Sequence, residues 1–407
     1  MSIRKSLNFE YALIHANYWM AYGTITCFAS AFLLGSSFSN SAIGLMLALS
    51  NIIALVMQPL TADIADRSHK VSLIEISLIM TYMIMAFSAC LFFIKGKSII
   101  LLAIYMMMVT MHTVMQPLVN SLNAKLGECG AMLNFGVCRS VGSLAYAVLC
   151  AIIGSLIVMK GIMVLPIMNE LILIALVFSL YSAAGKFNRL CAVNGVQKKE
   201  KNENQNIGLI KFARDNKLFL IMNLGIFLLY IHNQILNTFM LQIVSDVGGD
   251  AADTGRILSI MAFLEMPTLI GFKWLNRRFS CQTLIKAASI AFVAKITLIF
   301  FAQNVNMIYI AHLFQTFSYA LFLPAMVKYV EEVMKDGEQI KGQALYTTMI
   351  TAASIAGSIF GGFILDTQGA KFLTLLTAIC AAVGAAIIIS MVNKIKPYNN
   401  VDEYDSY

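Results

Sequence analysis

Three charged side chains interrupt segments that are otherwise apolar over about twenty residues. They are Arg139, Glu265 and Lys295. A charge that is buried alone is too costly in free energy, so each of these side chains must be paired or must face water. Ionisable residues inside such segments often mark a substrate or ion pathway. We therefore expect Arg139 to pair with Glu265 at a binding site, although a purely structural ion pair explains these two residues almost equally well.

Uncharged polar side chains recur at helical spacing along further apolar segments, which places them on one face of each helix. Any one of these stripes is explained equally well by hydrogen bonds between packed helices, at about half a kcal/mol per residue. Together they favour a polar cavity, whose aromatic rings, amides and imidazoles suit a sugar-like or flat organic solute. The stripes are Tyr11, His15, Tyr18, Tyr22 and Thr26; His112, Gln116, Asn120 and Asn123; Tyr230, Asn233 and Asn237, with His232 and Gln234 beside them; and His312, Gln315 and Tyr319.

The composition is that of a membrane protein. Of the 407 residues, 59% are hydrophobic and 12% are charged, whereas a soluble domain has about 25% charged residues. The net charge of +8 indicates Lys and Arg retained in cytoplasmic loops rather than binding to nucleic acid. The 8 cysteines form no C-x-x-C pair, so we expect no zinc site, no dithiol centre and no cofactor.

The apolar segments predict an all-α integral membrane protein with about twelve transmembrane helices in two pseudo-symmetric six-helix bundles. We expect one bundle over 1–185, a basic cytoplasmic linker over 186–216, a second bundle over 217–394 and a polar tail over 395–407. Both termini are expected in the cytoplasm. The predicted spans are 11–35, 42–61, 72–94, 98–121, 136–158, 162–184, 218–244, 255–275, 282–301, 305–330, 342–364 and 370–393.

The two halves of the sequence resemble each other. When the sequence from Gly44 is placed over the sequence from Gly255, Arg67 meets Arg278. Internal repeats of this kind are common in secondary transporters, which bind their substrates at the repeat interface near the middle of the membrane.

A cluster of charge follows the second predicted span, in the stretch TADIADRSHK. Carboxylates at this place can face helix N-termini and pair with basic side chains. We therefore expect a cytoplasmic gate that latches the two halves together in one state of the transport cycle, with a plain positively charged loop as the alternative. The expected gate residues are Asp63, Asp66, Arg67 and Lys70.

The core of this stretch, Ala65-Asp66-Arg67, resembles the signature loop of the major facilitator superfamily. The segments IGLMLALSNIIALVMQPL and NFGVCRSVGSLAYAVLCAIIGSL resemble the second and fifth spans of its lactose permease-like oligosaccharide/proton symporters and their sugar-efflux relatives. The resemblance implies that spans one, four, seven and ten line the cavity. It also implies that Arg139 binds sugar together with acids on spans four and eight.

The sequence departs from that group at several of these positions. Asn120 stands where the span-four acid is expected, and Glu265 lies about one helical turn from the span-eight position. The group's proton-handling His-Glu pair on span ten aligns with Gln315 and Ser318, so it is missing here. Lys295 takes the place of the span-nine Arg. Proton coupling would therefore use Glu265, with His312 as the second candidate.

We expect a secondary active transporter, and not an enzyme, that moves a sugar, an oligosaccharide or a similar small polar solute by alternating access. The alternative is efflux of drugs or other amphipathic compounds, since the 25 methionines could form adaptable surfaces. The expected partners are the solute, the lipid bilayer and protons, and the expected form is a monomer in the cell (inner) membrane. The expected binding residues are Arg139, Glu265, Asn120, Asn123, His15, Tyr18, Tyr22, Asn233, Asn237, Lys295, His312 and Gln315.

Overall fold

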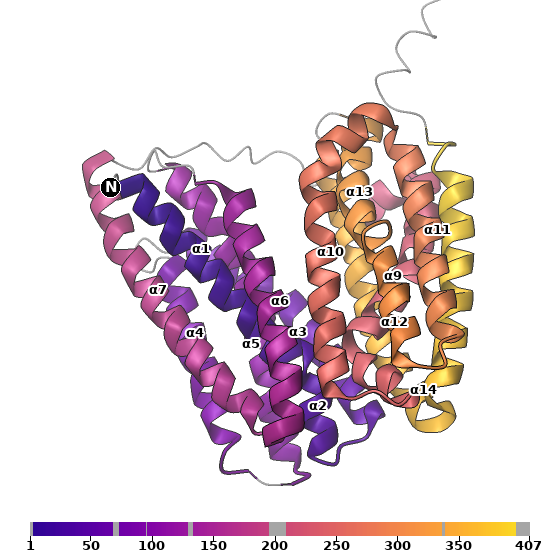
Figure 1. The fold of residues 1–407 in the computed structure, drawn as a ribbon. Helices are drawn as coiled ribbons and strands as arrows, with labels where there is room; N and C mark the ends of the chain where they lie inside the picture. Colours follow the sequence, from indigo (N-terminus) through magenta and orange to yellow (C-terminus); the bar gives the residue numbers. More distant parts are fainter. Residues whose placement is uncertain are drawn as a thin grey trace, which may run out of the picture. The chain divides into compact units, whose positions relative to one another are not determined.

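The computed structural model describes most of the chain, and every regular element in the described residues is helical (Figure 1). The chain divides into two compact units. Unit 1 comprises Met1–Glu203 and Ala251–Ser259, and unit 2 comprises Asn204–Asp250 and Ile260–Tyr407. The described residues are 3–67, 73–94, 96–128, 133–194, 209–335 and 338–395.

The helices follow one another with short connections. Those of the first half are α1 (Ile3–Tyr22), the π-helical turn η1 (Gly23–Cys27), α2 (Ala29–Gly35), α3 (Asn40–Arg67), α4 (Leu73–Cys90), α5 (Ile99–Glu128), α6 (Phe135–Lys160) and α7 (Val164–Asn194). Those of the second half are α8 (Leu209–Asp215), α9 (Lys217–Asp246), α10 (Ala251–Arg278), α11 (Cys281–Phe300), α12 (Val305–His312), the 3₁₀ turn η2 (Leu313–Gln315), α13 (Tyr319–Val333) and α14 (Gln339–Met391).

The predicted spans are present as helices. Within the described residues, 10 helices are long and apolar enough to cross a membrane. The first predicted span is α1, η1 and α2 in succession. The 53 residues of α14 hold the last two predicted spans, because the chain turns at Gly369, whose φ of 79° is one that glycine adopts without strain. Counted by span, the described chain therefore has the twelve predicted transmembrane helices.

The predicted linker is helical at both of its ends. Helix α7 continues to Asn194, past the predicted end of the first bundle, and α8 begins at Leu209. Residues 195–208 and the tail from 396 lie outside the described residues, so the predicted bounds of linker and tail stay predictions.

Large apolar side chains cover the outside of the helices. On α7, for example, Leu171 is 57% exposed and Phe178 is 70% exposed. A soluble protein rarely carries a continuous apolar surface of this kind, whereas contact with lipid tails favours it. The exposed stripe on α7 is therefore the lipid-facing side of the sixth span.

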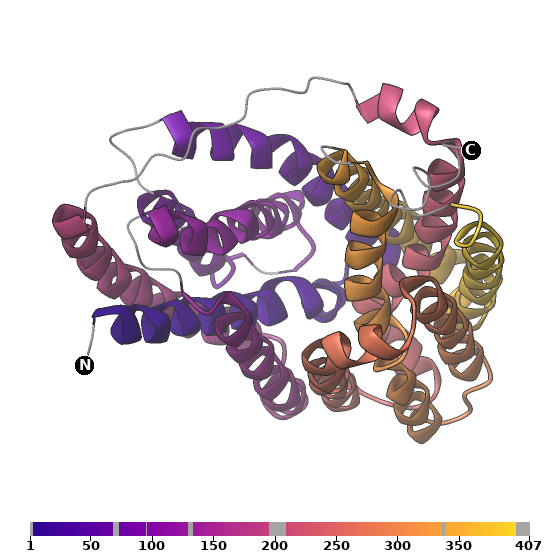
Figure 2. The ribbon, with the colours of Figure 1, turned by 90° about the horizontal axis from the view of Figure 1, so that it is seen from above.

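In unit 2, α9 packs along both halves of α14 (Figure 2). The approach is close where two glycines face each other. A Cβ atom on Gly384 would lie 2.6 Å from the carbonyl oxygen of Gly225, and one on Gly225 would lie 2.9 Å from that of Gly384. Small residues that let backbones approach in this way are the usual contact between membrane helices.

Two helices deviate from α-helical geometry at repeat-related positions. Phe28, directly after η1, has φ −97° and ψ 14°, and Phe239, inside α9, has φ −113° and ψ 25°. The alignment that places Gly44 over Gly255 also places Phe28 over Phe239. The internal repeat thus extends to the position at which the first and seventh spans bend.

A methyl group added at the glycine contact tests this packing. We expect Gly384→Ala to lower the free energy of unfolding by about 1–3 kcal/mol, because the new Cβ forces α9 and α14 apart. Gly271→Ala is the matched control, since it lies inside α10 and a Cβ there would meet no atom within 4 Å. Thermal unfolding of both variants in the same detergent checks the prediction. Equal melting temperatures for the two would contradict it.

Candidate functional site

In unit 1, the polar stripe of α1 contacts α5 and α6. The Tyr18 ring stacks on the His112 ring, with centroids 4.4 Å apart and planes at 12°. The Tyr18 hydroxyl donates to the His112 carbonyl oxygen over 3.1 Å, and His112 Nε2 lies 3.2 Å from the Tyr18 carbonyl oxygen. The Tyr22 ring lies 6.0 Å from that of His112 and 6.1 Å from that of Tyr146 on α6. The structure therefore brings Tyr18, Tyr22 and His112 together.

Arg139 lies on α6 next to this aromatic cluster. Its guanidinium carbon is 3.7 Å from the centroid of the Trp19 ring, and Nη1 donates to Ser143 Oγ over 2.6 Å. A cation over an indole ring is stabilised by about 0.5–2 kcal/mol, with the higher value where water is excluded. The sequence analysis missed Trp19, although Trp19 lies four residues after His15 and thus on the same face of α1. Arg139 and Glu265 belong to different units, and their pairing stays a prediction.

Several buried nitrogen atoms around Arg139 have no hydrogen-bond partner. His15 is fully buried, with its ring edge-on to Tyr11 at 4.6 Å and to Phe135 at 5.7 Å. Neither of its ring nitrogens is hydrogen-bonded, and the same holds for Trp19 Nε1 and His112 Nδ1. Buried polar atoms are normally paired, so a group of unpaired ones calls for an explanation. A polar solute that bound here would supply the partners.

The two predicted amides of α5 differ in what they contact. The side-chain oxygen of Asn123 accepts the backbone N–H of Leu133 over 2.9 Å and so holds the segment that precedes α6. Asn120 is half-buried, and its carbonyl oxygen accepts the Tyr11 hydroxyl at 3.3 Å. Both stay predicted binding residues, and the Asn123 amide oxygen is already engaged with the backbone.

In unit 2, a chain of hydrogen bonds connects a buried lysine with a half-buried acid. Lys295 on α11 is fully buried. Its Nζ donates to Gln315 Oε1 over 2.7 Å, and Gln315 Nε2 donates to Glu265 Oε1 over 2.8 Å. The amide dipole of Gln315 thus points its oxygen at the ammonium group and its N–H at the carboxyl group. Three of the predicted site residues form one unit, which we call the Lys-Gln-Glu chain.

A break in the tenth span places Gln315 between the two charges. The span is divided into α12 and α13 (Figure 1), and Gln315 ends the 3₁₀ turn η2 between them. Helix α10 holds the break through reciprocal bonds: Thr268 Oγ1 donates to the Thr316 carbonyl oxygen, and Thr316 Oγ1 donates to the Leu264 carbonyl oxygen, both over 3.1 Å. The Lys-Gln-Glu chain therefore lies where the 3₁₀ turn η2 interrupts the α-helix of the tenth span.

Two buried histidines flank this chain. His312 and His232 are both fully buried and lie close enough to Lys295 to experience its charge. His312 Nδ1 is 2.8 Å from the Ile308 carbonyl oxygen, while His312 Nε2 and both ring nitrogens of His232 are unpaired. The His232 ring meets Phe292 edge-on, with centroids 5.9 Å apart. His232 is a second residue that the sequence analysis left out of its binding set.

The amides predicted on α9 share a face with Tyr230, as their spacing requires. Asn233 is buried and Asn237 is half-buried. The Tyr230 hydroxyl lies 3.1 Å from that of Tyr346 on α14. Tyr230 therefore contacts α14, and Asn233 and Asn237 stay predicted binding residues.

The predicted gate lies mostly outside the described side chains. Asp63 is exposed near the end of α3. Asp66 and Arg67 belong to the last turn of α3 by their backbone alone, and Lys70 lies outside the described residues. The latch between the two halves stays a prediction.

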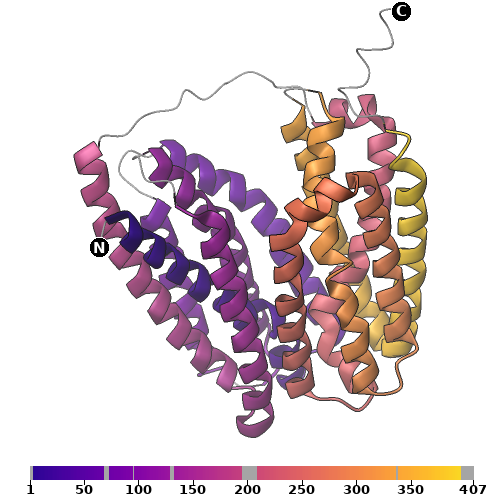
Figure 3. The same ribbon diagram turned by 45° about the horizontal axis from the view of Figure 1, so that its top comes forward.

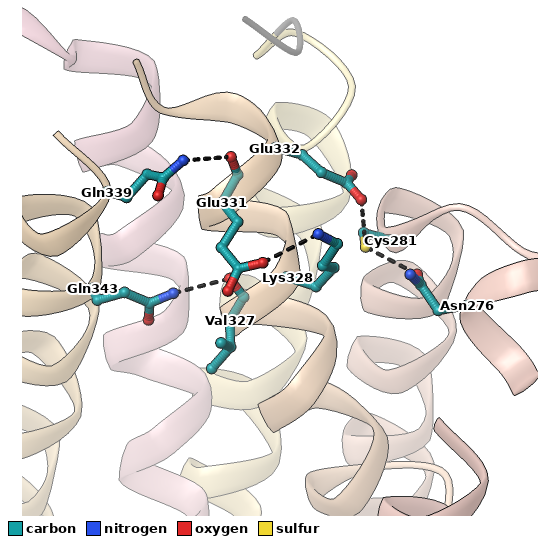
Figure 4. A network of polar contacts seen from close by, with 8 residues as sticks. All are labelled: Asn276, Cys281, Val327, Lys328, Glu331, Glu332, Gln339 and Gln343. Carbon is teal, nitrogen blue, oxygen red and sulfur yellow. Dashed lines mark hydrogen bonds and ion pairs between the residues drawn. The ribbon is translucent and has the colours of Figure 1, made fainter. Parts of the chain in front are cut away.

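The repeat-related place in unit 2 is described, and it holds a polar network (Figure 4). Cys281 Sγ at the start of α11 contacts Asn276 Oδ1 at 3.1 Å and Glu332 Oε1 at 3.4 Å. Lys328 Nζ pairs with Glu331 Oε2 at 3.1 Å. Gln343 and Gln339 at the start of α14 donate to the carbonyl oxygens of Val327 and Glu331 over 2.9 Å and 3.3 Å. The network connects the ends of α10, α11, α13 and α14.

One further buried acid was missed by the sequence analysis. Glu10 on α1 is 8% exposed. Its Oε1 accepts from Ser182 Oγ over 2.8 Å and pairs with Lys186 Nζ. Both partners lie on α7, which runs beside α1 (Figure 3). This ion pair holds the first and sixth spans together within unit 1. The sequence signal was weak, because Glu10 directly precedes the predicted first span.

The described residues include no group of three or more His, Cys, Asp or Glu that could hold a metal ion. The chain was compared with known families and structures. The sequence model of the MFS_1 like family matches residues 11–376. The chain belongs to this family. A comparison with curated proteins gives no match.

Solved transporter structures have the same fold as this MFS_1-like chain. A mutant form of the nucleoside transporter NupG is 16% identical, with a TM-score of 0.73 over 96% of this chain and 100% of that one. A bacterial homologue of the iron transporter ferroportin, in an inward-facing state, is 13% identical with a TM-score of 0.73 over 96% and 100%. A bacterial homologue of the lysosomal transporter Spinster is 13% identical with a TM-score of 0.67 over 97% and 98%.

These comparisons confirm the predicted resemblance to the major facilitator superfamily and the predicted fold class. The MFS_1-like chain is a multi-pass membrane protein, a secondary transporter by family, and not an enzyme. Identities this low show the fold alone, so the substrate has to be inferred from the residues of this chain.

Loss of the central amide tests the Lys-Gln-Glu chain. We expect Gln315→Leu to lower the free energy of unfolding by about 2–4 kcal/mol, because both charges lose a charge-assisted hydrogen bond. Gln343→Leu is the matched control, since Gln343 is half-buried and donates to one backbone carbonyl oxygen of the same unit, with no charged partner. Thermal unfolding in detergent compares the two. A Gln315→Leu protein as stable as Gln343→Leu would show that the amide does not support the charges.

Proposed function

We propose that this MFS_1-like transporter moves a small polar organic solute, such as a sugar, an oligosaccharide or a nucleoside, by alternating access. It would do so as a monomer in the cell (inner) membrane, with both termini in the cytoplasm. The nucleoside is included because it combines a sugar with a flat ring, and because a structurally similar protein, NupG, is named as a nucleoside transporter.

The observation that carries the substrate class is the group of unpaired nitrogens beside Arg139. His15, His112 and Trp19 offer buried nitrogen atoms that could bond hydroxyl or carbonyl oxygens. The rings of Tyr18 and Trp19 lie next to them and meet edge to face, with centroids 5.5 Å apart. A solute with hydroxyl groups on a ring matches both properties, whereas an amphipathic drug would leave the nitrogens unpaired at a cost of about 1–3 kcal/mol for each.

We propose Glu265 as the proton carrier, with His312 as the second candidate. The support is that Glu265 is a half-buried acid in a membrane-spanning helix, and that its neighbour Gln315 connects it to the amino group of Lys295. Binding a proton would remove the charge that Lys295 balances. The electrostatic state of unit 2 would then change within the cycle, as coupling requires.

The proposed gate consists of Asp63, Asp66, Arg67 and Lys70. Its support is the charge pattern of the stretch and the polar network at the repeat-related end of unit 2 (Figure 4). That network connects α10, α11, α13 and α14 through polar side chains. We propose that the acidic and basic side chains at the end of α3 likewise connect helix ends.

A ligand panel tests the substrate class. We expect sugars or nucleosides to raise the melting temperature of purified protein, by about 2.7 kcal/mol of stabilisation at a hundredfold excess over Kd. Arg139→Ala should abolish the shift, because the guanidinium and the indole ring position the solute. Arg256→Ala, at an exposed arginine paired with Asp253, should keep it. A response to cationic and amphipathic drugs alone would contradict the proposal and favour drug export.

The role of Glu265 is tested by the pH dependence of uptake into proteoliposomes. We expect the wild type to respond to pH between about 5 and 8, and Glu265→Gln to lose this response, because an amide binds no proton in that range. Glu331→Gln, at an exposed acid of the same unit, should respond like the wild type. Retained pH dependence in Glu265→Gln would exclude Glu265 as the carrier.

A further inference from the structure

The ammonium group of Lys295 lies in surroundings that resemble a site for a metal cation. Its Nζ is 2.7 Å from an amide oxygen, and the same amide leads to a carboxylate. Amide and carboxylate oxygens are the ligands that hard cations take. A fully buried lysine head group is costly, so its retention here calls for a reason beyond packing.

The backbone around Gln315 strengthens this comparison. The tenth span is discontinuous between His312 and Tyr319. In secondary transporters, unwound segments and half-helix ends of this kind coordinate coupling cations. Here α10 fixes the break through Thr268 and Thr316. The segment is therefore held by α10, and Lys295 contacts it from α11 through Gln315.

We propose that Lys295 is a built-in counter-ion, occupying the place in unit 2 where a monovalent cation such as Na⁺ would neutralise Glu265. The wild type consequently binds no Na⁺ at this site. Removal of the lysine side chain lets Na⁺ take the place of the ammonium group at Gln315 Oε1, while Gln315 Nε2 keeps its hydrogen bond to the Glu265 carboxylate. The inference deepens the proposed transport function and rests on it, since it names the charge that balances the proposed proton carrier.

Other titratable groups surround the chain on several helices. Tyr230 and His232 face it from α9, and His312 faces it from α12. All of these are fully or almost fully buried. Glu265 is the acid that acts on Lys295.

The test uses purified full-length protein and Na⁺ itself. Wild type, Lys295→Ala and the double variant Lys295→Ala/Glu265→Gln are prepared in NaCl and in choline chloride at equal ionic strength. Melting temperature and equilibrium binding of radioactive Na⁺ are measured for each. Lys328→Ala is the matched control, because Lys328 is an exposed lysine of the same unit that pairs with Glu331.

We expect the wild type, Lys328→Ala and the double variant to show no saturable Na⁺ binding and no Na⁺-dependent melting shift. We expect Lys295→Ala to melt lower than the wild type in choline and to regain stability with saturable Na⁺ binding. A Lys295→Ala protein that can be purified in NaCl but not in choline supports the proposal equally.

Three results would overturn the proposal. They are specific Na⁺ binding by the wild type, a folded Lys295→Ala protein that ignores Na⁺, and a Lys295→Ala protein that fails to fold in either salt while the double variant folds in both. The last result would show that Na⁺ cannot replace the ammonium group. No solute is needed, so these results are separate from the ligand panel that tests the transported substrate.

Discussion

The cost of burying charge inside a membrane-spanning bundle is the constraint on which the site depends. An isolated Lys295 or Glu265 in unit 2 would be strongly unfavourable, and a direct contact would require α10 and α11 to approach through the tenth span. Gln315 resolves this by extending an amide to both charges, over 2.7 Å and 2.8 Å. It can do so because it ends the 3₁₀ turn between α12 and α13. The interruption of the tenth span therefore positions the amide that joins Lys295 to Glu265.

In unit 1, the charged side chain of Arg139 is stabilised by different contacts. The Arg139 guanidinium lies over the Trp19 ring and donates to Ser143, so its charge is stabilised by a π-system and a hydroxyl group. The related spans also differ, because α5 runs unbroken from Ile99 to Glu128 while the tenth span is divided. By contrast, the first and seventh spans deviate at the repeat-related residues Phe28 and Phe239. The first and seventh spans therefore bend at equivalent residues, next to the polar stripes of α1 and α9. The two units differ in the contacts that stabilise their charged side chains.

Hydropathy and periodicity were sufficient for the spans, because lipid requires every span to be long, apolar and helical. They could not locate the breaks. Pro59, Pro117, Pro267 and Pro324 lie inside helices that continue through them, whereas the π-turn at Gly23–Cys27 and the break after His312 contain no proline. These breaks follow from tertiary contacts, such as the bond from the Tyr105 hydroxyl to the Ile25 carbonyl oxygen and those of Thr268 and Thr316. Periodicity likewise placed Asn123 on a polar face but could not show that its amide holds the backbone of Leu133.

The charge state of Glu265 in the resting protein is the point on which the account depends most. Infrared difference spectroscopy between the wild type and Glu265→Gln, without solute at neutral pH, measures it directly. The account predicts that the bands of one ionised carboxylate are present in the wild type and absent from the variant, because Lys295 balances the carboxylate through Gln315. It also predicts that the protonated-carboxyl bands of the two proteins are the same. A protonated-carboxyl band that is present in the wild type and missing from Glu265→Gln would contradict the account.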